Sequence, residues 1–274
     1  MKTFKFISIL SFCIIFFAGC SSSNSSPETD NNNDDTQTSE SPSLPANAVT
    51  ITTSNATSVA TSAASSVDTA SLLFAVETGI PSSKLAIDAI VDSVFNRSRT
   101  ITSTAASVTD ACPISGSITD DFVDSATSST GTSSFNACDL GGITINGVFT
   151  YTIESNFADG PFTDSGHGAM SITIGTESFT IDLIYSTDGN TNTGEYSVTM
   201  TYSMSESAFG GYLVETTEAL TGIYPADATS GQLIVSGANS TRLRLTITSP
   251  TTIDVQLDDG NGIFVMHNTI SVNT

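Results

Sequence analysis

The sequence predicts a mainly β protein: an antiparallel sheet, either a sandwich or a curved half-barrel, with two short N-terminal helices. From about residue 114 onward, apolar and polar residues alternate with a period of two, as in strands with one buried and one wet face. Gly, Asn, Asp and Pro turn signals separate these runs, and no helical pattern between them could supply parallel crossovers. We therefore expect one antiparallel β domain over residues 111–274.

The two helices are expected within residues 49–110, ahead of the sheet. Ser66 precedes the run 67–78, which stops at Gly79 with Pro81 just beyond, the usual order of helix stop signals. Residues 84–96 form the second run, with apolar residues at helical spacing on one face: Ile87, Ile90, Val91, Val94 and Phe95. Between tether and helices, the Thr/Ser/Ala-rich stretch 49–65 either prolongs the tether or adds a first strand at 49–53.

The alternation also indicates which side chains face inward. In residues 143–153 the odd positions are apolar, and the even ones are mostly Thr or Asn. The inward Met and Tyr residues of the following runs would line a cavity or fill a core: Met170, Tyr185, Tyr196, Met200, Tyr202 and Met204. Both residue types suit either role. We expect a solid core, because the helix at 84–96 has an apolar face that needs to be buried.

Residues 242–248 and 252–257 form an expected hairpin centred on Pro250. Directly paired residues lie on the same side of a sheet, so this centre sets Arg242 opposite Asp258 and Arg244 opposite Gln256. We expect a solvent-side cross-strand pair that contributes at most about 1 kcal/mol. The alternative is an anion site formed by unpaired arginines.

The N-terminus carries an export signal. Lys2 and Lys5 precede an apolar run over residues 6–18 that is too short to cross a membrane. Residues 17–20, Phe-Ala-Gly-Cys, then resemble the lipobox of bacterial lipoproteins. The resemblance implies that residues 1–19 are removed, that Cys20 receives lipid (palmitate among its acyl chains) and that it becomes the new N-terminus. Ser21, at the position after this cysteine, resembles the residue found there in lipoproteins that Gram-negative bacteria sort to the outer membrane. This resemblance implies a bacterial outer-membrane location. The alternative is a plain secreted protein cleaved nearby.

Between the lipobox and the folded part, residues 20–48 have no apolar periodicity and are rich in Ser, Asn, Asp and Pro. Such a composition buries too little apolar surface to offset the entropy of ordering, so we expect a disordered tether.

Charge and cysteine content narrow the possible partners. The formal net charge is −21, and removal of Lys2 and Lys5 with the signal makes it −23. A chain this acidic repels nucleic acid and anionic lipid headgroups.

Of the four cysteines, Cys13 leaves with the signal and Cys20 takes the lipid. The remaining pair, Cys112 and Cys138, is expected to form a disulfide in an exported protein.

No pattern in the sequence identifies a reaction, a cofactor or a metal. His167 and His267 are the only histidines, and neither G-x-S-x-G nor H-E-x-x-H occurs. Two Asp/Asn-rich segments offer oxygen ligands for calcium but fit hairpin turns better, because Asp-Gly and Asn-Gly favour such turns; they contain Asp188, Asn190 and Asn192, and Asp258, Asp259 and Asn261.

The layout resembles uncharacterised β-rich bacterial lipoproteins, a resemblance that implies no activity. We therefore expect a lipid-anchored, non-catalytic outer-membrane β protein with a structural or surface-interaction role, attached to the membrane by its lipid. The alternative is a carrier that binds an apolar, lipid-like ligand in a cavity of the β domain. The partner, a protein or an apolar small molecule, is not specified by the residues.

Overall fold

The computed structural model describes residues 41–64, 105–125, 127–140, 143–155, 160–206, 210–224 and 226–271. The chain divides into two compact units, Met1–Thr38 and Ser39–Thr274, and every described residue belongs to the second. The signal, Cys20, most of the tether and the expected helices at 67–78 and 84–96 lie outside the described residues. No helix among the described residues is long and apolar enough to cross a membrane.

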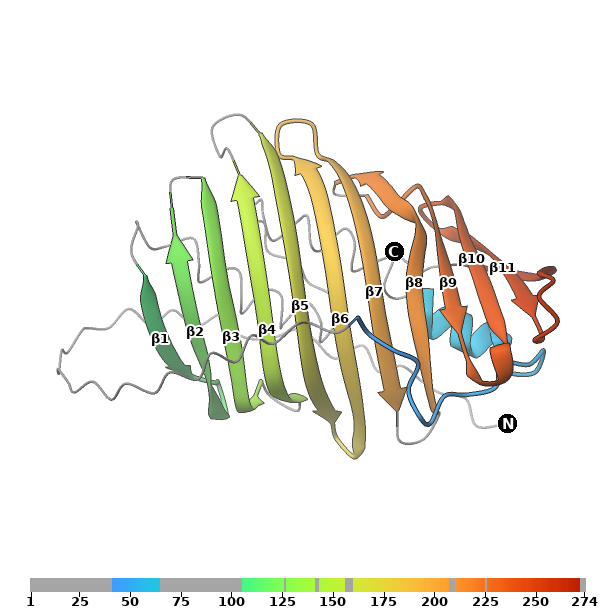
Figure 1. The fold of residues 1–274 in the computed structure, drawn as a ribbon, viewed down its shortest axis with the longest axis horizontal. Helices are drawn as coiled ribbons and strands as arrows, with labels where there is room; N and C mark the ends of the chain where they lie inside the picture. Colours follow the sequence, from blue (N-terminus) through green and yellow to red (C-terminus); the bar gives the residue numbers. More distant parts are fainter. Residues whose placement is uncertain are drawn as a thin grey trace. The chain divides into compact units, whose positions relative to one another are not determined.

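The described part of the chain forms one open sheet of twelve antiparallel strands, hydrogen-bonded in chain order from β1 to β12 (Figure 1). The prediction of a mainly β, antiparallel fold is confirmed. The described strands form one continuous sheet and not the two separate sheets of a sandwich. The first strand begins at residue 106, ahead of the expected domain start at 111. The strands are β1 (Ala106–Ala111), β2 (Ser115–Asp124), β3 (Ser128–Asp139), β4 (Ile143–Ser155), β5 (Pro161–Ile174), β6 (Glu177–Asn190), β7 (Glu195–Glu206), β8 (Gly210–Ile223), β9 (Ser230–Ser236), β10 (Arg242–Ser249), β11 (Thr252–Asp258) and β12 (Val265–Ser271).

The alternation read from the sequence matches the two faces of the sheet. We call the face that carries the apolar residues the inner face and the other the outer face. One row across the inner face runs through directly paired residues from Phe149 on β4 to Leu257 on β11, and nearly all its side chains are buried. The core therefore lies on one side of the sheet, and the outer face is left for other contacts.

Aromatic rings of the inner face lie over glycines of the neighbouring strands. A Cβ atom placed on Gly166 would lie 2.7 Å from Tyr185 Cε1 and 2.8 Å from Phe149 Cζ. The rings of Phe149 and Tyr185 are themselves stacked, with centroids 6.0 Å apart. Gly131 is similarly covered by the ring of Tyr151. These glycines have no side chain because an aromatic ring from the next strand occupies that space.

A helix at residues 56–64 packs on the inner face near the C-terminal strands (Figure 1). The Ser62 hydroxyl lies 2.8 Å from the Tyr212 hydroxyl on β8, and the Tyr202 hydroxyl on β7 donates to the Ala63 carbonyl at 3.4 Å. The buried side of this helix consists of small residues at helical spacing: Ala56, Val59, Ala60, Ala63 and Ala64. Small side chains let the helix approach the sheet closely.

This helix replaces the tether extension or first strand expected at 49–65. In the segment before it, Ala48 forms only an isolated parallel bridge to Gly211. The buried Ile51 amide donates to Thr241 Oγ1 at 2.9 Å, which attaches the segment to the turn between β9 and β10. Ordered structure thus includes residues 41–48, the end of the expected tether.

Candidate functional site

Four threonines on the outer face of β3 and β4 form a compact group, which we call the threonine array: Thr130, Thr132, Thr150 and Thr152. The register pairs Thr130 with Thr152 and Thr132 with Thr150, and the last two hydroxyls lie 3.3 Å apart. All four side chains are exposed or half-buried. Because both strands are hydrogen-bonded on each side, their side chains stand on a rigid base.

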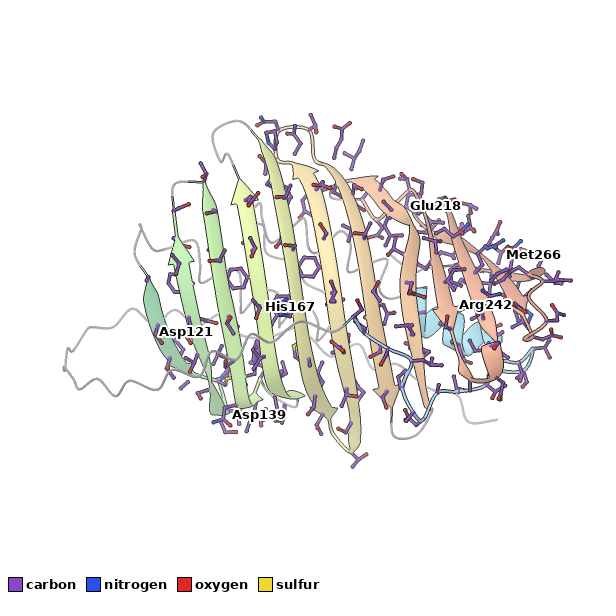
Figure 2. All side chains as sticks on the ribbon, in the orientation of Figure 1. Asp121, Asp139, His167, Glu218, Arg242 and Met266 are labelled. Atoms are coloured by element: carbon purple, nitrogen blue, oxygen red, sulfur yellow. A yellow bond between two sulfur atoms is a disulfide. The ribbon has the colours of Figure 1, made fainter. Side chains whose placement is uncertain are left out.

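A shallow depression of about 620 Å³ lies over the array. Asp121 on β2 pairs directly with Thr132, is exposed and lines this depression. On the other side, His167 on β5 pairs with Thr150 and is half-buried. Figure 2 shows Asp121 and His167 on this part of the sheet, far from Met266 near its other end. The array is therefore a hydroxyl-rich surface with a carboxylate on one flank and an imidazole on the other.

His167 acts electrostatically on a neighbouring carboxylate. Its side chain makes no hydrogen bond within the described residues, and its charge acts on Asp182. Burial raises the pKa of Asp182 on β6, and the charge of His167 works in the opposite direction. No group of three or more His, Cys, Asp or Glu side chains among the described residues is placed to hold a metal ion.

The segment that contains Asp188, Asn190 and Asn192 forms the turn between β6 and β7. Asn190 Oδ1 accepts the Asn192 amide at 2.9 Å, and the Thr191 amide donates to the Gly160 carbonyl at 2.7 Å. Asp188 lies on the strand itself, paired with Thr163. The side-chain oxygen of Asn190 thus helps to shape the turn.

The second Asp-rich segment is closed around Asp258. Its Oδ1 accepts the amides of Gly260 at 3.0 Å and Gly262 at 2.8 Å, and its Oδ2 accepts Arg242 Nη2 at 2.7 Å. Burial works to raise the pKa of Asp258, but these hydrogen bonds and the guanidinium charge outweigh it and hold the pKa below its usual range. Asp258 therefore joins the sheet to the loop that follows it.

The predicted register of the hairpin β10–β11 is confirmed, with Arg242 opposite Asp258 and Arg244 opposite Gln256. The expectation of a solvent-side pair is wrong for Asp258, which is 0% exposed. Phe264 lies over both guanidinium groups, 4.1 Å from that of Arg244 to the ring centroid and 5.1 Å from that of Arg242. The turn thus covers Asp258, whereas the Arg242 side chain stays 40% exposed. Both arginines are hydrogen-bonded, Arg242 to Asp258 and Arg244 to Gln256, so they do not form the alternative anion site of unpaired arginines.

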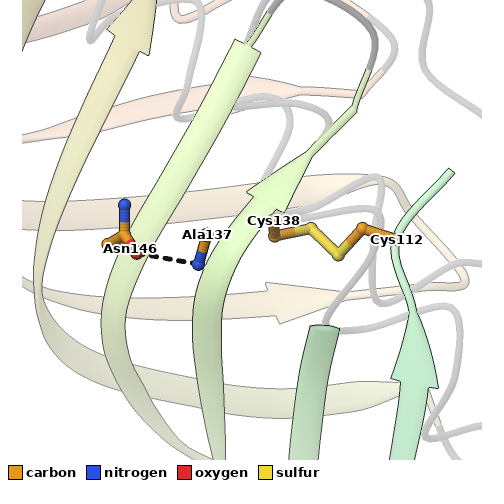
Figure 3. The surroundings of a disulfide bond; sticks show 4 residues. All are labelled: Cys112, Ala137, Cys138 and Asn146. Atoms are coloured by element: carbon orange, nitrogen blue, oxygen red, sulfur yellow. Dashed lines mark hydrogen bonds between the residues drawn. A yellow bond between two sulfur atoms is a disulfide. The ribbon is translucent and has the colours of Figure 1, made fainter. Parts of the chain in front are cut away.

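The predicted disulfide joins Cys112 and Cys138, whose Cα atoms are 5.4 Å apart (Figure 3). A β-bulge in β3 turns the Cys138 side chain to the face of the sheet on which the disulfide forms. On β3, Asn136 and Ala137 together oppose the single residue Asn146 of β4, whose Oδ1 accepts the Ala137 amide at 2.7 Å. Without the extra residue, Cys138 would face outward like Ser134; with it, Cys138 turns to the buried face.

The Met and Tyr residues expected to line a cavity or fill a core lie on the inner face. Met170, Tyr185, Tyr196, Met200 and Tyr202 are buried, and Met204 is half-buried. His267, the other histidine, lies on β12, where its Nε2 is 3.4 Å from the Thr57 hydroxyl of the helix.

The threonine array was missed in the sequence. Its signal is the pattern Thr-x-Thr, present at 130–132 and 150–152, but the register is needed to show that the two pairs adjoin. Comparison of the chain with protein-family models, with curated proteins and with solved structures gives no match. The functional argument therefore depends on the surfaces of the molecule itself.

Proposed function

We propose that this protein is an exported, lipid-anchored and non-catalytic β protein that acts by surface interaction, and that the threonine array binds a neutral, hydroxyl-rich polymer such as a polysaccharide. The observation that supports this most directly is the pair of facing Thr–Thr couples beneath one shallow depression. Threonine hydroxyls both donate and accept hydrogen bonds, as sugar hydroxyls do, and their methyl groups offer apolar contact.

The setting of the array favours a neutral ligand. Asp121 beside it and the net charge of −21 oppose polyanions. The array lies on β3 and β4, which both have a hydrogen-bonded neighbour on each side. Its side chains are therefore already held in place, and little ordering is needed when a ligand binds. A depression this open suits an extended chain lying across the strands better than an enclosed small molecule.

Substitution of the paired hydroxyls tests the site. The double variant Thr132→Val and Thr150→Val keeps shape and β propensity but removes two hydroxyls, each worth about 1 kcal/mol in a hydrogen bond. Affinity electrophoresis through gels that contain dextran, a soluble glucan or a galactomannan should show retardation of the wild-type protein. The variant should bind at least about tenfold more weakly.

The matched control is Thr199→Val with Thr201→Val, on the outer face of β7 and outside the depression. This control should be retarded like the wild-type protein. Equal losses in both double variants, or no retardation by any of these polysaccharides, would reject the array as a glycan surface.

The lipid anchor at Cys20 completes the proposal and has its own test. Two or three acyl chains on one cysteine give stable anchoring, since each buried CH₂ contributes about 0.8 kcal/mol. Metabolic labelling with palmitate should tag the protein, and Cys20→Ser should abolish the label. Cys13→Ser, a change within the same signal, should keep it. Label that persists in Cys20→Ser would show that the lipobox interpretation is wrong.

A further inference from the structure

The last strand of the sheet is an open edge. Among the described residues, β12 pairs with β11 alone, and its side chains form hydrogen bonds to Thr57 and Asp254 of the same chain. Open edges are usually protected by charges or Pro. β12 contains no Asp, Glu, Lys, Arg or Pro. Within the strand itself a bulge at His267 is the protective feature, and among the described residues Thr57 of the helix contacts the side chains of His267 and Asn268.

Exposed apolar side chains gather at this edge. Ile263, Val265 and Met266 are 65%, 61% and 52% exposed, and they lie within four consecutive residues. Val265 pairs with Leu257 and so lies on the inner face, whereas Met266 pairs with Gln256 on the outer face. A partner docked on one face would cover only one of them. A strand added at the edge would cover both.

Charge favours this edge for contact between two copies of an acidic chain. Arg242 and Arg244, the only Lys or Arg side chains among the described residues, lie two strands in from β12. They equal in number the two aspartates of β11, the strand next to β12, which are Asp254 and Asp258. The opposite edge has no such balance: β1 carries Asp110, its neighbour β2 carries Asp120, Asp121 and Asp124, and neither strand contains Lys or Arg. Two copies of a chain with a net charge of −21 therefore approach with less repulsion through β12.

We propose that β12 pairs with β12 of a second copy, antiparallel and about a two-fold axis. The bulge at His267 makes the strand self-complementary, because it places Val265 and Ile270 on one face and Met266 and Thr269 on the other. With the axis between His267 and Asn268, Val265 of one copy meets Ile270 of the other, and Met266 meets Thr269. Like faces then meet, and the interface closes as a dimer.

Analytical ultracentrifugation of the full chain carrying Cys20→Ser, which has no lipid to drive association, tests the dimer. A single strand pair is a small interface, so we expect reversible, weak association. Higher salt should strengthen it by screening the net repulsion. Val265→Glu, which places like charges in both copies, should raise the dissociation constant at least about tenfold. Val148→Glu, an exposed apolar residue on β4, should leave it unchanged.

Cross-linking tests the register independently. A mixture of Met266→Cys and Thr269→Cys proteins should form a disulfide-linked heterodimer under mild oxidation, in higher yield than either variant alone. Both positions are exposed, so the fold should tolerate the changes. A chain that stays monomeric at all concentrations and gives no heterodimer would overturn the proposal. So would equal weakening by Val265→Glu and Val148→Glu.

Discussion

Replacing Cys112 and Cys138 with alanine is expected to lower the free energy of unfolding by about 3.5 kcal/mol. The two cysteines are separated by 26 residues, and the bond removes the freedom of that loop from the unfolded chain. It also connects the segment after β1 to the bulged end of β3, near the open β1 edge of the sheet. Among the described residues β1 pairs with β2 alone, so the strands at this edge should be the first to separate.

Equilibrium unfolding in urea measures the effect, with and without a reducing agent. The wild-type protein should lose a similar amount of stability on reduction, whereas the double alanine variant should not respond to the reductant. Asp139→Ala, an exchange beside Cys138 that keeps the bond, is the control. A wild-type protein whose unfolding midpoint is the same in reductant would contradict the expectation.

Asp258→Ala is expected to cost about 3 kcal/mol of stability. The carboxylate is fully buried and accepts hydrogen bonds from Arg242, Gly260 and Gly262. Hydrogen bonds to charged groups contribute roughly 1.5–3 kcal/mol, and removal of one partner also leaves donors unsatisfied. Asp258→Asn retains an acceptor for the turn amides and should cost less than Asp258→Ala. Thermal or urea unfolding measures both variants.

The control is Asp259→Ala, at the next position along the chain, where the side chain is exposed. Its effect should stay within about 0.5 kcal/mol. If Asp258→Ala were as mild as this control, the closed turn would not contribute to stability.

Acid should reproduce part of the Asp258 effect. The pKa of this carboxyl is lower in the folded than in the unfolded chain, so its contribution is fully present above the unfolded value of about 3.9. The contribution is lost as the pH falls through the folded pKa. The wild-type protein should therefore lose more stability below about pH 4 than Asp258→Asn does. Unfolding curves at a series of acidic pH values would show this difference.

The features that the sequence determined are those set by short-range geometry. Alternation with a period of two fixes which side chains share a face, and the strands β4 to β7 and β9 to β11 follow it. In β8 the register shifts around Glu218 interrupt the alternation. Parity required the paired numbers of the hairpin to have an even sum, and a turn centred on Pro250 then predicted the pairing of Arg242 with Asp258 that the structure shows. With Cys13 and Cys20 assigned to the expected signal and lipid anchor, Cys112 and Cys138 remained as the predicted pair, and the structure joins them.

The helix at residues 56–64 was decided by tertiary packing. Its buried side is almost entirely Ala, which gives a weak periodic signal in a stretch rich in Thr and Ser. Such residues become a buried helix face only when a sheet is close enough to cover them, as β7 and β8 are in this fold. Isolated helices of this length are unstable in water, so packing supplies the stabilisation that propensity does not.

Tertiary structure also decided the burial of Asp258 and the formation of the threonine array. Phe264 and the turn exclude water from a carboxylate that strand alternation alone would leave in solvent. The four threonines adjoin because β3 and β4 pair in one particular register, set in part by the bulge at Asn136 and Ala137. Neither outcome can be read from one strand, because burial and adjacency depend on groups distant in the chain, whereas alternation depends only on the backbone of the strand itself.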